Sequence, residues 1–536
     1  MSNLELAWMD GIIGLSRLAR RFFCFVLLVG VAGYFSCAAQ AEKLSVDEVT
    51  ALQGGRARNT LFAVADSDTA NAAANTAVNT TPTAAADDEV EALLRQAAED
   101  DARSAAAMPS ASLPAKLPDM AAPAGQVFTS TAKSANALQG FAQFELARAL
   151  NDPSHWSKML TRVELGRSGK FNDTLKWKVS ARVDYDAVFD TTNFYPSQVR
   201  SDQRFNASFR ETYIDADAGD WDIRLGRQHV VWGEMVSLFF ADVVSARDMR
   251  EFILPEFNIL RIPQWAARAE YFKNDFHAEL LWIPLPTYDE TGKPGSEFFP
   301  LQPEFSGFST RYLNENKPSR RLANSNFGVR GSWLAHGWDV SGFFYRSMDA
   351  APTFYRRIVL APQPEIIYEA RHDRISQVGG TLAKDFGSMV LKTEMVATRG
   401  RRLSVLRLNE TDGVVRQNTF DWVVGLDVPL PSEARFNVQF FQSVITNHDP
   451  DVIPKKVESG YSLLLNGKLH PQVEAEVLWV ASFNRADWML RPKVNWAFEK
   501  NWRLATGVDV FHGAPDGLFG RYDKRDRVFS ELKYYF

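Results

Sequence analysis

The feature that most constrains this chain is a two-residue alternation of apolar and polar side chains in its C-terminal part. The stretch 174–189, TLKWKVSARVDYDAVF, shows it best. One set of alternate positions is apolar or aromatic: Leu175, Trp177, Val179, Ala181, Val183, Tyr185, Ala187 and Phe189. The other set is polar or charged: Lys176, Lys178, Ser180, Arg182, Asp184 and Asp186. Period two is the pleat of a β-strand with two different faces, so the pattern predicts an all-β fold.

These alternating segments are long for the strands of a soluble domain. They run for about 10 to 16 residues, whereas globular strands usually have about 5 to 6 and a tilted membrane-spanning strand needs about 9 to 11. Aromatic residues recur near their ends, as in interfacial girdles. A soluble sandwich also alternates, but in lipid only a closed sheet satisfies its edges. We therefore predict a transmembrane antiparallel β-barrel of about 16–18 strands, with a mostly disordered N-terminal periplasmic tail.

Counting back from the C-terminus places about eighteen such segments. They lie near 138–149, 157–168, 174–189, 203–217, 221–231, 264–273, 275–284, 324–335, 337–360, 364–385, 387–399, 416–428, 434–446, 457–469, 472–484, 487–498, 501–511 and 524–536. Tight turns such as 335–338 alternate with long connections such as 232–263 and 285–323. Outer-membrane barrels have short periplasmic turns and long external loops. An even strand number would then put both ends of the barrel in the periplasm.

The first forty residues indicate export. Three arginines precede an apolar run at 22–35, and Ala-Gln-Ala at 39–41 fits a cleavage site. The run is shorter than the roughly 20 residues of a spanning helix, although a retained anchor helix or a lipoprotein signal at Cys37 is an alternative. Both cysteines of the chain precede residue 41, so the exported protein would have no thiol chemistry.

The composition changes twice along the chain. Residues 42–136 contain no Trp or Tyr and are rich in Ala, Thr, Asn and Pro, so they cannot bury enough apolar area to fold as a domain. One of two short helices expected there spans about 88–103. We therefore predict a signal peptide at 1–41, a low-complexity periplasmic tail with short helices at 42–136, and an outer-membrane β-barrel at 137–536. A net charge of −5 argues against a nucleic-acid binder.

The chain ends in an amphipathic strand with a terminal aromatic ring. This ending resembles the signal by which the outer-membrane barrel assembly machinery recognises its clients, so that machinery is an expected partner. The assembly-signal residues would be Leu532, Tyr534 and Phe536.

A barrel of 16 to 18 strands is wide enough to hold an aqueous channel. The charged side of the alternating segments should line it. The channel-lining candidates are Lys176, Lys178, Arg182, Asp184, Arg210, Arg224, Arg435, Glu474, Glu476, Arg491, Lys493, Arg503 and Asp509. The alternative is that these charges pair with one another and only stiffen the wall.

The connection 232–263 is too apolar for a freely solvated loop. We expect it to fold into the barrel and narrow it, with a short helix from Ser245 to Arg250. The constriction-loop candidates are Trp232, Glu234, Asp242, Arg247, Asp248 and Arg250. A lid over the outer mouth and two further strands are the alternatives.

The same region carries a family resemblance. LGRQHVVWGE at 225–234, followed by DVVSARDMRE at 242–251, resembles the GRQ-x-x-x-WGE and DV-x-(N/S)-x-RD pattern of a porin-like proteobacterial outer-membrane barrel family of unknown function. The likeness extends through FRETYIDAD at 209–217 and covers roughly residues 138–536. It implies traffic of small hydrophobic or lipid-like molecules. It also implies a periplasmic carrier and an efflux-type inner-membrane transporter as partners.

The pattern as a whole predicts a channel or conduit in the outer membrane of a Gram-negative bacterium, in contact with lipopolysaccharide. We expect no enzyme activity, no cofactor and no metal site. One alternative is an outer-membrane component of a multi-protein export or uptake system without pore activity of its own. A barrel hydrolase is less favoured, because none of the eight histidines lies in a hydrolase motif. A plugged receptor would need a plug domain that the Ala/Thr-rich tail is too short and too polar to form.

Overall fold

The computed structural model describes residues 138–233, 235, 238–360 and 362–536. The signal peptide expected at 1–41 and the tail expected at 42–136 lie outside the described residues, and so does Glu234. Across the described residues, helices are short, and none has the length and apolarity that a membrane-spanning helix requires.

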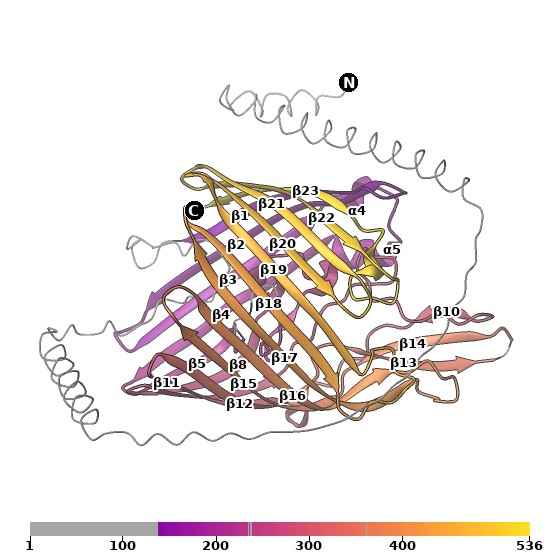
Figure 1. The fold of residues 1–536 in the computed structure, drawn as a ribbon, viewed down its shortest axis with the longest axis horizontal. Helices are drawn as coiled ribbons and strands as arrows, with labels where there is room; N and C mark the ends of the chain where they lie inside the picture. The colour runs from indigo at the N-terminus through magenta and orange to yellow at the C-terminus, as the bar shows by residue number, and fades with distance from the viewer. Residues whose placement is uncertain (1–137, 234, 236–237, 361) are drawn as a thin grey trace, which may run out of the picture. The chain divides into compact units, whose positions relative to one another are not determined.

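The described chain folds into an 18-stranded antiparallel sheet that closes on itself (Figure 1). The prediction of a closed barrel is confirmed, and so is the strand number. Its strands are β1 Gln139–Ala149, β2 His155–Lys170, β3 Leu175–Asp186, β4 Phe205–Ala218, β5 Trp221–Gln228, β8 Gln264–Lys273, β9 Phe276–Leu285, β11 Asn326–Ala335, β12 Trp338–Met348, β15 Arg374–Asp385, β16 Val390–Ser404, β17 Val414–Leu430, β18 Ala434–Ile445, β19 Val457–His470, β20 Val473–Ser482, β21 Trp488–Glu499, β22 Trp502–His512 and β23 Arg527–Tyr535.

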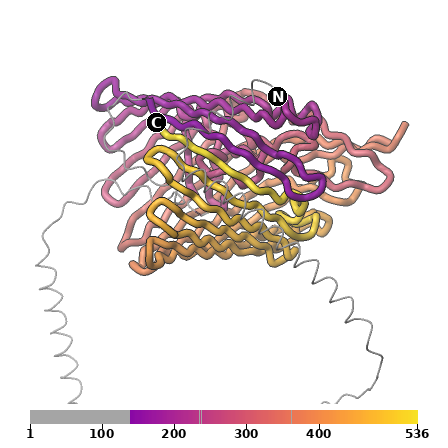
Figure 2. Tube along the Cα trace, turned by 90° about the horizontal axis from the view of Figure 1, so that it is seen from above, coloured from indigo at the N-terminus to yellow at the C-terminus, as the bar shows by residue number. Residues whose placement is uncertain are grey.

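The barrel closes where its first and last strands meet. β1 pairs with β23 from Phe141 and Tyr535 to Ala149 and Arg527. The backbones of Gly140 and Phe536 complete the ladder with two hydrogen bonds of 3.2 and 3.1 Å. Figure 2 shows the indigo first strand beside the yellow last strand. Both ends of the barrel therefore lie at the same rim, as the even strand number predicts.

The apolar side chains point outward. Val179 is 41% exposed and Trp479 is 38% exposed, whereas the neighbouring Arg182 and Asp184 are buried inside the barrel. A sheet packed as a soluble sandwich would show the opposite. The exterior therefore suits hydrocarbon, and the charges gather inside.

Short turns and long loops are segregated to opposite rims. The rim that holds Phe536 carries two-residue turns such as His336-Gly337, where both residues have positive φ (52° and 72°) as a type I′ hairpin requires. The other rim carries the long loops. They contain α4 Val188–Thr191, α5 Ser197–Gln203, β6 Ala246–Arg247, η1 Met249–Glu251, α6 Phe257–Leu260, β7 Arg261–Ile262, β10 Ser309–Tyr312, η2 Leu322–Asn324, β13 Thr353–Val359, β14 Glu365–Arg371 and η3 Gly520–Tyr522.

Two of the strands predicted from the sequence are too long. The segments 337–360 and 364–385 each divide into a barrel strand and a strand of a separate three-stranded sheet, β10-β14-β13, which projects beyond the barrel (Figure 1). The alternation continues through both segments because the small sheet has its own apolar cluster. That cluster contains Phe299, Phe354, Ile366, Tyr368 and Ala370.

The strand predicted at 174–189 also ends early. The side chain of Asp186 accepts hydrogen bonds from the backbone N–H groups of Met159 (2.9 Å) and Val188 (3.1 Å). The chain turns there into α4, so Phe189 is buried against Val188 and Tyr195 rather than exposed to lipid.

Candidate functional site: the barrel lumen and its folded-in loop

Residues 229–263, here called the lumen loop, pack against the inner wall of the barrel on one side. Val230, Trp232, Ala241 and Val244 form a buried cluster with wall residues of β8, β9, β12 and β16. The wall residues are Ala266, Leu281, Ile283, Phe343, Tyr345 and Val396. Trp232 is 1% exposed, and its ring lies 5.2 Å from that of Phe343. The apolar content of this connection is therefore explained by burial inside the barrel.

The same loop also reaches a different part of the wall. Phe252 and Leu254 belong to a second cluster with residues of β19 to β22. Its wall members are Leu464, Leu478, Val480, Met489 and Phe511. Because β8 and β9 are far from β20 and β21 around the ring of strands, the loop crosses the lumen. It is neither a pair of additional barrel strands nor a lid confined to the outer mouth.

Buried carboxylates hold the first part of the loop. Glu279 on β9 accepts a hydrogen bond of 3.1 Å from the indole Nε1 of Trp232. Glu394 on β16 accepts from the backbone N–H groups of Met235 (3.1 Å) and Ala241 (2.8 Å). These hydrogen bonds to two buried carboxyl groups fix where the loop enters the lumen.

Two arginines hold the last part of the loop. The guanidinium of Arg210 on β4 donates to the carbonyl oxygens of Asn258 (2.9 Å) and Arg261 (2.7 Å). Arg182 on β3 donates to the carbonyl of Ile259 at 3.3 Å and pairs with Glu164 at 2.7 Å. These two channel-lining candidates thus position the lumen loop.

The helix predicted from Ser245 to Arg250 is wrong. The chain forms the short strand β6 and then the 3-10 turn η1, whose N-cap is Asp248. The side chain of Ser245 donates to the carbonyl of Val230 at 3.0 Å and caps nothing. Within the lumen loop, β6 pairs with β7, so residues 246 and 247 are extended where the helix was expected.

The candidates of the constriction loop fall into two groups. Trp232 and Asp242 are buried at 1% exposure each, and Asp242 pairs with Arg261 at 2.8 Å. Arg247, Asp248 and Arg250 are partly exposed. Only these three can present charge to solvent within the lumen, and Glu234 lies outside the described residues.

The long connection that follows β9 binds the lumen loop through Asp289 and Glu290. The carboxylate of Asp289 accepts from the backbone N–H of Arg247 at 2.8 Å, and the backbones of Glu290 and Met249 are bonded at 2.8 Å. Burial raises the pKa of Asp289 to about 6, although the charge of Arg247 opposes the shift. The docking of the two loops therefore depends on a carboxyl group that titrates close to neutral pH.

Most channel-lining candidates form ion pairs with residues on neighbouring strands. The pairs are Lys178 with Glu211, Asp184 with Arg162 (2.8 Å), Arg224 with Asp215 (2.6 Å), Arg435 with Asp427 (2.7 Å), Glu476 with Lys493 (3.1 Å) and Arg491 with Asp509 (2.7 Å). Glu474 accepts from Asn466 at 2.8 Å, Arg503 donates to backbone carbonyls at the short-turn rim, and Lys176 is exposed near the same rim. Pairing across the ladder accounts for much of the internal charge.

Two small cavities lie between the lumen loop and the wall formed by β1–β3 and β21–β23. One, of about 70 Å³, faces the long-loop rim, where Asp186, Gln203 and Glu297 line it. The other, of about 50 Å³, faces the short-turn rim and reaches Gln143, Asn495 and Lys533. Each holds a few water molecules at most. Six residues line both cavities: Lys158, Arg162, Glu251, Pro255, Ile259 and Arg527.

The residues shared by the two cavities are not among the candidates that the sequence predicts. Glu251 on the lumen loop pairs with Lys158 on β2 at 2.6 Å and with Arg527 on β23 at 3.2 Å. Lys158 also pairs with Glu145 at 2.8 Å. The alternation of β2 and β23 marks Lys158 and Arg527 as inward-facing, but nothing local marks Glu251 as their partner. Among the described residues, no group of acids and histidines is arranged to hold a metal ion.

A closed antiparallel barrel with an apolar exterior, a charged interior and a folded-in loop is an outer-membrane β-barrel of porin-like fold. The chain belongs to the family described as "Protein of unknown function (DUF1302)", whose model matches residues 24–536. The resemblance stated from the sequence is confirmed.

The comparison with solved structures finds matches that cover about three quarters of this chain. OccAB1 of Acinetobacter baumannii is 7% identical with a TM-score of 0.48, covering 75% of this chain and 96% of its own. OccK8 (OprE) of Pseudomonas aeruginosa is 11% identical with a TM-score of 0.45, covering 75% and 98%. OmpF of Salmonella typhi, in complex with daunomycin, is 10% identical with a TM-score of 0.38, covering 75% and 97%. No curated protein matches the chain.

Proposed function

We propose that this protein is a narrow outer-membrane channel for small polar or charged solutes, and not an enzyme. The observation that carries the proposal is the pair of cavities flanking the same six residues, which marks a path between the lumen loop and the wall. Along that path, Lys158, Arg162 and Arg527 face Glu251 on the loop. A solute that passes must lose part of its hydration water and interact with these charged side chains instead.

The size of the path favours small solutes. Cavities of about 70 and 50 Å³ admit ions, water and small organic groups, whereas a sugar needs the loop to move. The family resemblance implies a hydrophobic or lipid-like cargo instead. An apolar solute would displace water from buried charges without replacing its hydrogen bonds, so we favour polar cargo on this path.

The proposal also includes the proteins with which this chain would interact. We propose that assembly depends on the barrel assembly machinery, which would recognise Leu532, Tyr534 and Phe536. A periplasmic carrier and an efflux-type inner-membrane transporter are proposed partners, and they belong to the rival function, an outer-membrane component without its own pore. That rival predicts a barrel that conducts only in their presence.

Planar-bilayer conductance of the refolded full-length chain tests the proposal. We expect small, ion-selective steps without any partner, and liposome swelling that is faster with amino-acid-sized solutes than with disaccharides or apolar solutes. The control is a variant lacking residues 235–260, which should conduct strongly and so report correct insertion. A silent full-length protein beside a conducting deletion variant would favour the partner-dependent component.

A further inference from the structure

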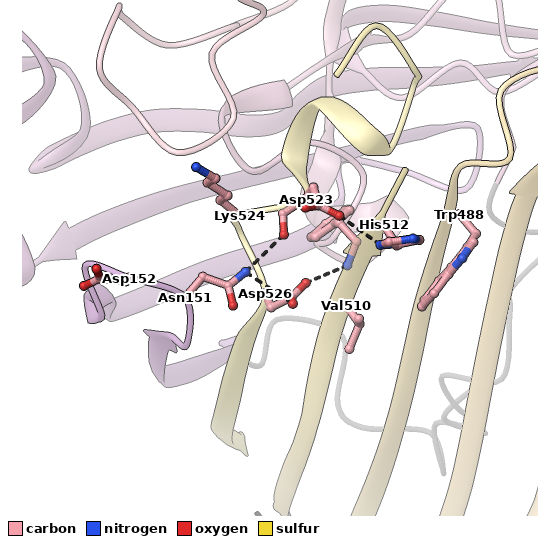
Figure 3. Close-up of a pocket in the computed structure, with 9 residues that line it drawn as sticks. Asn151, Asp152, Trp488, Val510, His512, Asp523, Lys524 and Asp526 are labelled. Carbon is pink, nitrogen blue, oxygen red and sulfur yellow. Dashed lines mark hydrogen bonds and ion pairs between the residues drawn. The ribbon is translucent and has the colours of Figure 1, made fainter. Parts of the chain in front are cut away.

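The histidines of this chain differ in what their two ring nitrogens contact. The Nδ1 of His512 bonds to the carboxylate of Asp523 at 3.0 Å (Figure 3). His277 lies between the carboxylate of Glu270 and the hydroxyl of Ser332, which can itself donate. Because a neutral imidazole has one N–H group and one acceptor nitrogen, the neutral ring satisfies each of these arrangements.

Two other histidines, His155 and His372, each lie between two oxygens that can only accept. At the start of β2, the Nδ1 of His155 is 2.7 Å from a backbone carbonyl oxygen and its Nε2 is 2.7 Å from the carboxylate of Glu297. Between β14 and β15, the Nδ1 of His372 is 2.8 Å from a backbone carbonyl oxygen and its Nε2 is 2.7 Å from the carboxylate of Glu315. Only an imidazolium has the two N–H groups that both contacts need. Each histidine with its glutamate is here called a clasp.

The two glutamates are ionised acceptors. Glu297 also accepts from the hydroxyl of Tyr195 at 2.8 Å and pairs with Arg525 at 3.2 Å. Glu315 also pairs with Lys317 at 3.3 Å. Burial by itself would raise the pKa of each carboxyl group, but the imidazoles and these partners lower the pKa of both below its ordinary value. The group of each clasp that changes its charge near neutral pH is therefore the imidazole.

The His155 clasp lies beside an apolar contact with the lumen loop. Glu297 belongs to the connection 286–325 between β9 and β11, and it directly precedes Phe298. The ring of Phe298 lies 6.5 Å from that of Phe252 on the lumen loop, and both rings belong to one buried cluster. The bond from His155 to Glu297 therefore fixes Phe298 against the lumen loop.

The His372 clasp lies beside a polar contact with the same loop. The ring of His372 is 4.1 Å from that of Tyr288, which directly precedes Asp289, the residue that binds the backbone N–H of Arg247. Besides those of the clasp and Lys317, the titratable or charged groups on the elements around His372 are Tyr288, Asp289, Asp349, Arg374 and Arg401. Asp289 is unchanged in the variants below, so its own titration does not distinguish them.

We propose that the His155 and His372 clasps hold the connection 286–325, and through it the lumen loop, at acidic pH and release them as the pH rises. An ordinary imidazole loses its proton near pH 6.5, on average about 6.5. A folded state that needs the imidazolium is favoured at low pH, and this advantage is lost as the rings lose their second proton. The neutral ring keeps one contact of each clasp and leaves the other acceptor without its donor.

Hydrogen exchange of the full-length protein, refolded in detergent, tests the clasps at about pH 5.5 and about pH 8, the range over which histidine titrates. The amides followed are those of residues 245–260 in the lumen loop. The variant combines His155→Gln with His372→Gln, because glutamine keeps N–H donors and never carries a charge. At the lower pH we expect exchange about tenfold faster in the double variant, which corresponds to the loss of about one charge-assisted hydrogen bond. At the higher pH the two proteins should exchange alike.

Comparing variants at the same pH cancels the intrinsic pH dependence of exchange. His448→Gln is the matched control, because the Nε2 of His448 faces a single backbone carbonyl oxygen at 3.3 Å in another external loop. Equal exchange of the unmodified protein and the double variant at the lower pH would refute the clasps. A difference that persists at the higher pH would refute their dependence on protonation. Should the double variant fail to fold, each single variant must show a smaller increase in exchange at the lower pH, and no increase in either overturns the proposal.

The consequence for permeation rests on the proposed channel function. Bilayer conductance of the unmodified protein and of His448→Gln should rise from the lower to the higher pH, whereas that of the double variant should be high at both. An unchanged conductance beside the expected exchange would refute control of the channel by the clasps. A barrel that is silent at both pH values but keeps the exchange difference would refute the channel and support the clasps.

Discussion

Replacing Glu251 by Gln should change the ion selectivity of the channel without displacing the lumen loop. Glu251 pairs with Lys158 at 2.6 Å and with Arg527 at 3.2 Å, and all three residues line both cavities. Removing one partner of a buried pair usually costs about 3 to 5 kcal/mol. Here each base keeps a second carboxylate, Glu145 for Lys158 and Asp509 for Arg527, both at 2.8 Å. Since Gln also keeps an acceptor oxygen, we expect the loop to stay in place.

The size of the effect follows from the local charge. Around the constriction, four bases and four acids balance: Lys158, Arg162, Arg491 and Arg527 with Glu145, Asp184, Glu251 and Asp509. The substitution leaves a net charge of +1. At about 5 Å in water, one charge changes the energy of a monovalent ion by about 0.8 kcal/mol, or about fourfold in occupancy. The occupancy of cations falls about fourfold and that of anions rises about fourfold, so the permeability ratio should move toward anions by about sixteenfold.

The assay is the reversal potential across a planar bilayer in a potassium chloride gradient. Glu433→Gln is the control, because Glu433 lies in a short turn with its side chain 70% exposed, where salt screens its charge. We expect the control to match the unmodified protein. An unchanged reversal potential in Glu251→Gln, with conductance also unchanged, would show that ions do not pass between the loop and this wall.

Four further predictions follow from the same geometry. Deleting residues 235–260 should raise single-channel conductance severalfold, because the lumen loses its crossing loop. Phe252→Ala should cost about 3 to 5 kcal/mol of loop packing, seen as added conductance substates and faster proteolysis of the loop. Val477 lies in the middle of β20 with its side chain on the outer face. Val477→Arg should therefore lower the free energy of unfolding in lipid by about 2 to 4 kcal/mol, because it places a charge in the membrane, and urea titration measures this change. Because the folded pKa of Asp289 is raised to about 6, its contribution favours folding at low pH and is lost as the pH rises through about 6. Asp289→Asn should flatten that dependence in thermal unfolding between pH 4.5 and 7.5.

The strands of the barrel wall could be predicted because the signal for each strand lies within its own sequence. Each spanning strand must present apolar side chains to lipid at every second position, so the sequence of one strand suffices to identify it. The approach failed at 337–360 and 364–385, where strands continue into a small external sheet. Alternation indicates that a strand has one apolar and one polar face. It does not indicate whether lipid or a second apolar cluster covers the apolar face.

For the interior of the barrel, the sequence predicts that the side chains are charged but not which of them pair. The alternation predicts that charges such as Arg182 and Asp184 lie on the inner face, where the structure buries both, but their partners depend on strand register and barrel closure. Glu251 meets Arg527 across 276 positions of sequence, which no local signal encodes. The apolar content of 232–263 indicated burial, yet the helix expected from Ser245 was wrong, since pairing of β6 with β7 took precedence over local propensity.

The two kinds of contact made by the lumen loop have different physical consequences. Its apolar anchors, among them Trp232 and Phe252, each contribute about 1.5 to 3 kcal/mol by leaving water, and they lie on different parts of the wall. Its ion pairs contribute little net free energy, because desolvation offsets attraction. The anchors therefore hold the loop across the lumen, while under the proposed channel function charges such as Glu251 would decide which ions enter the remaining space. Selectivity can then change by substitution at the charges while the loop keeps its position, which separates the determinants of permeation from those of folding.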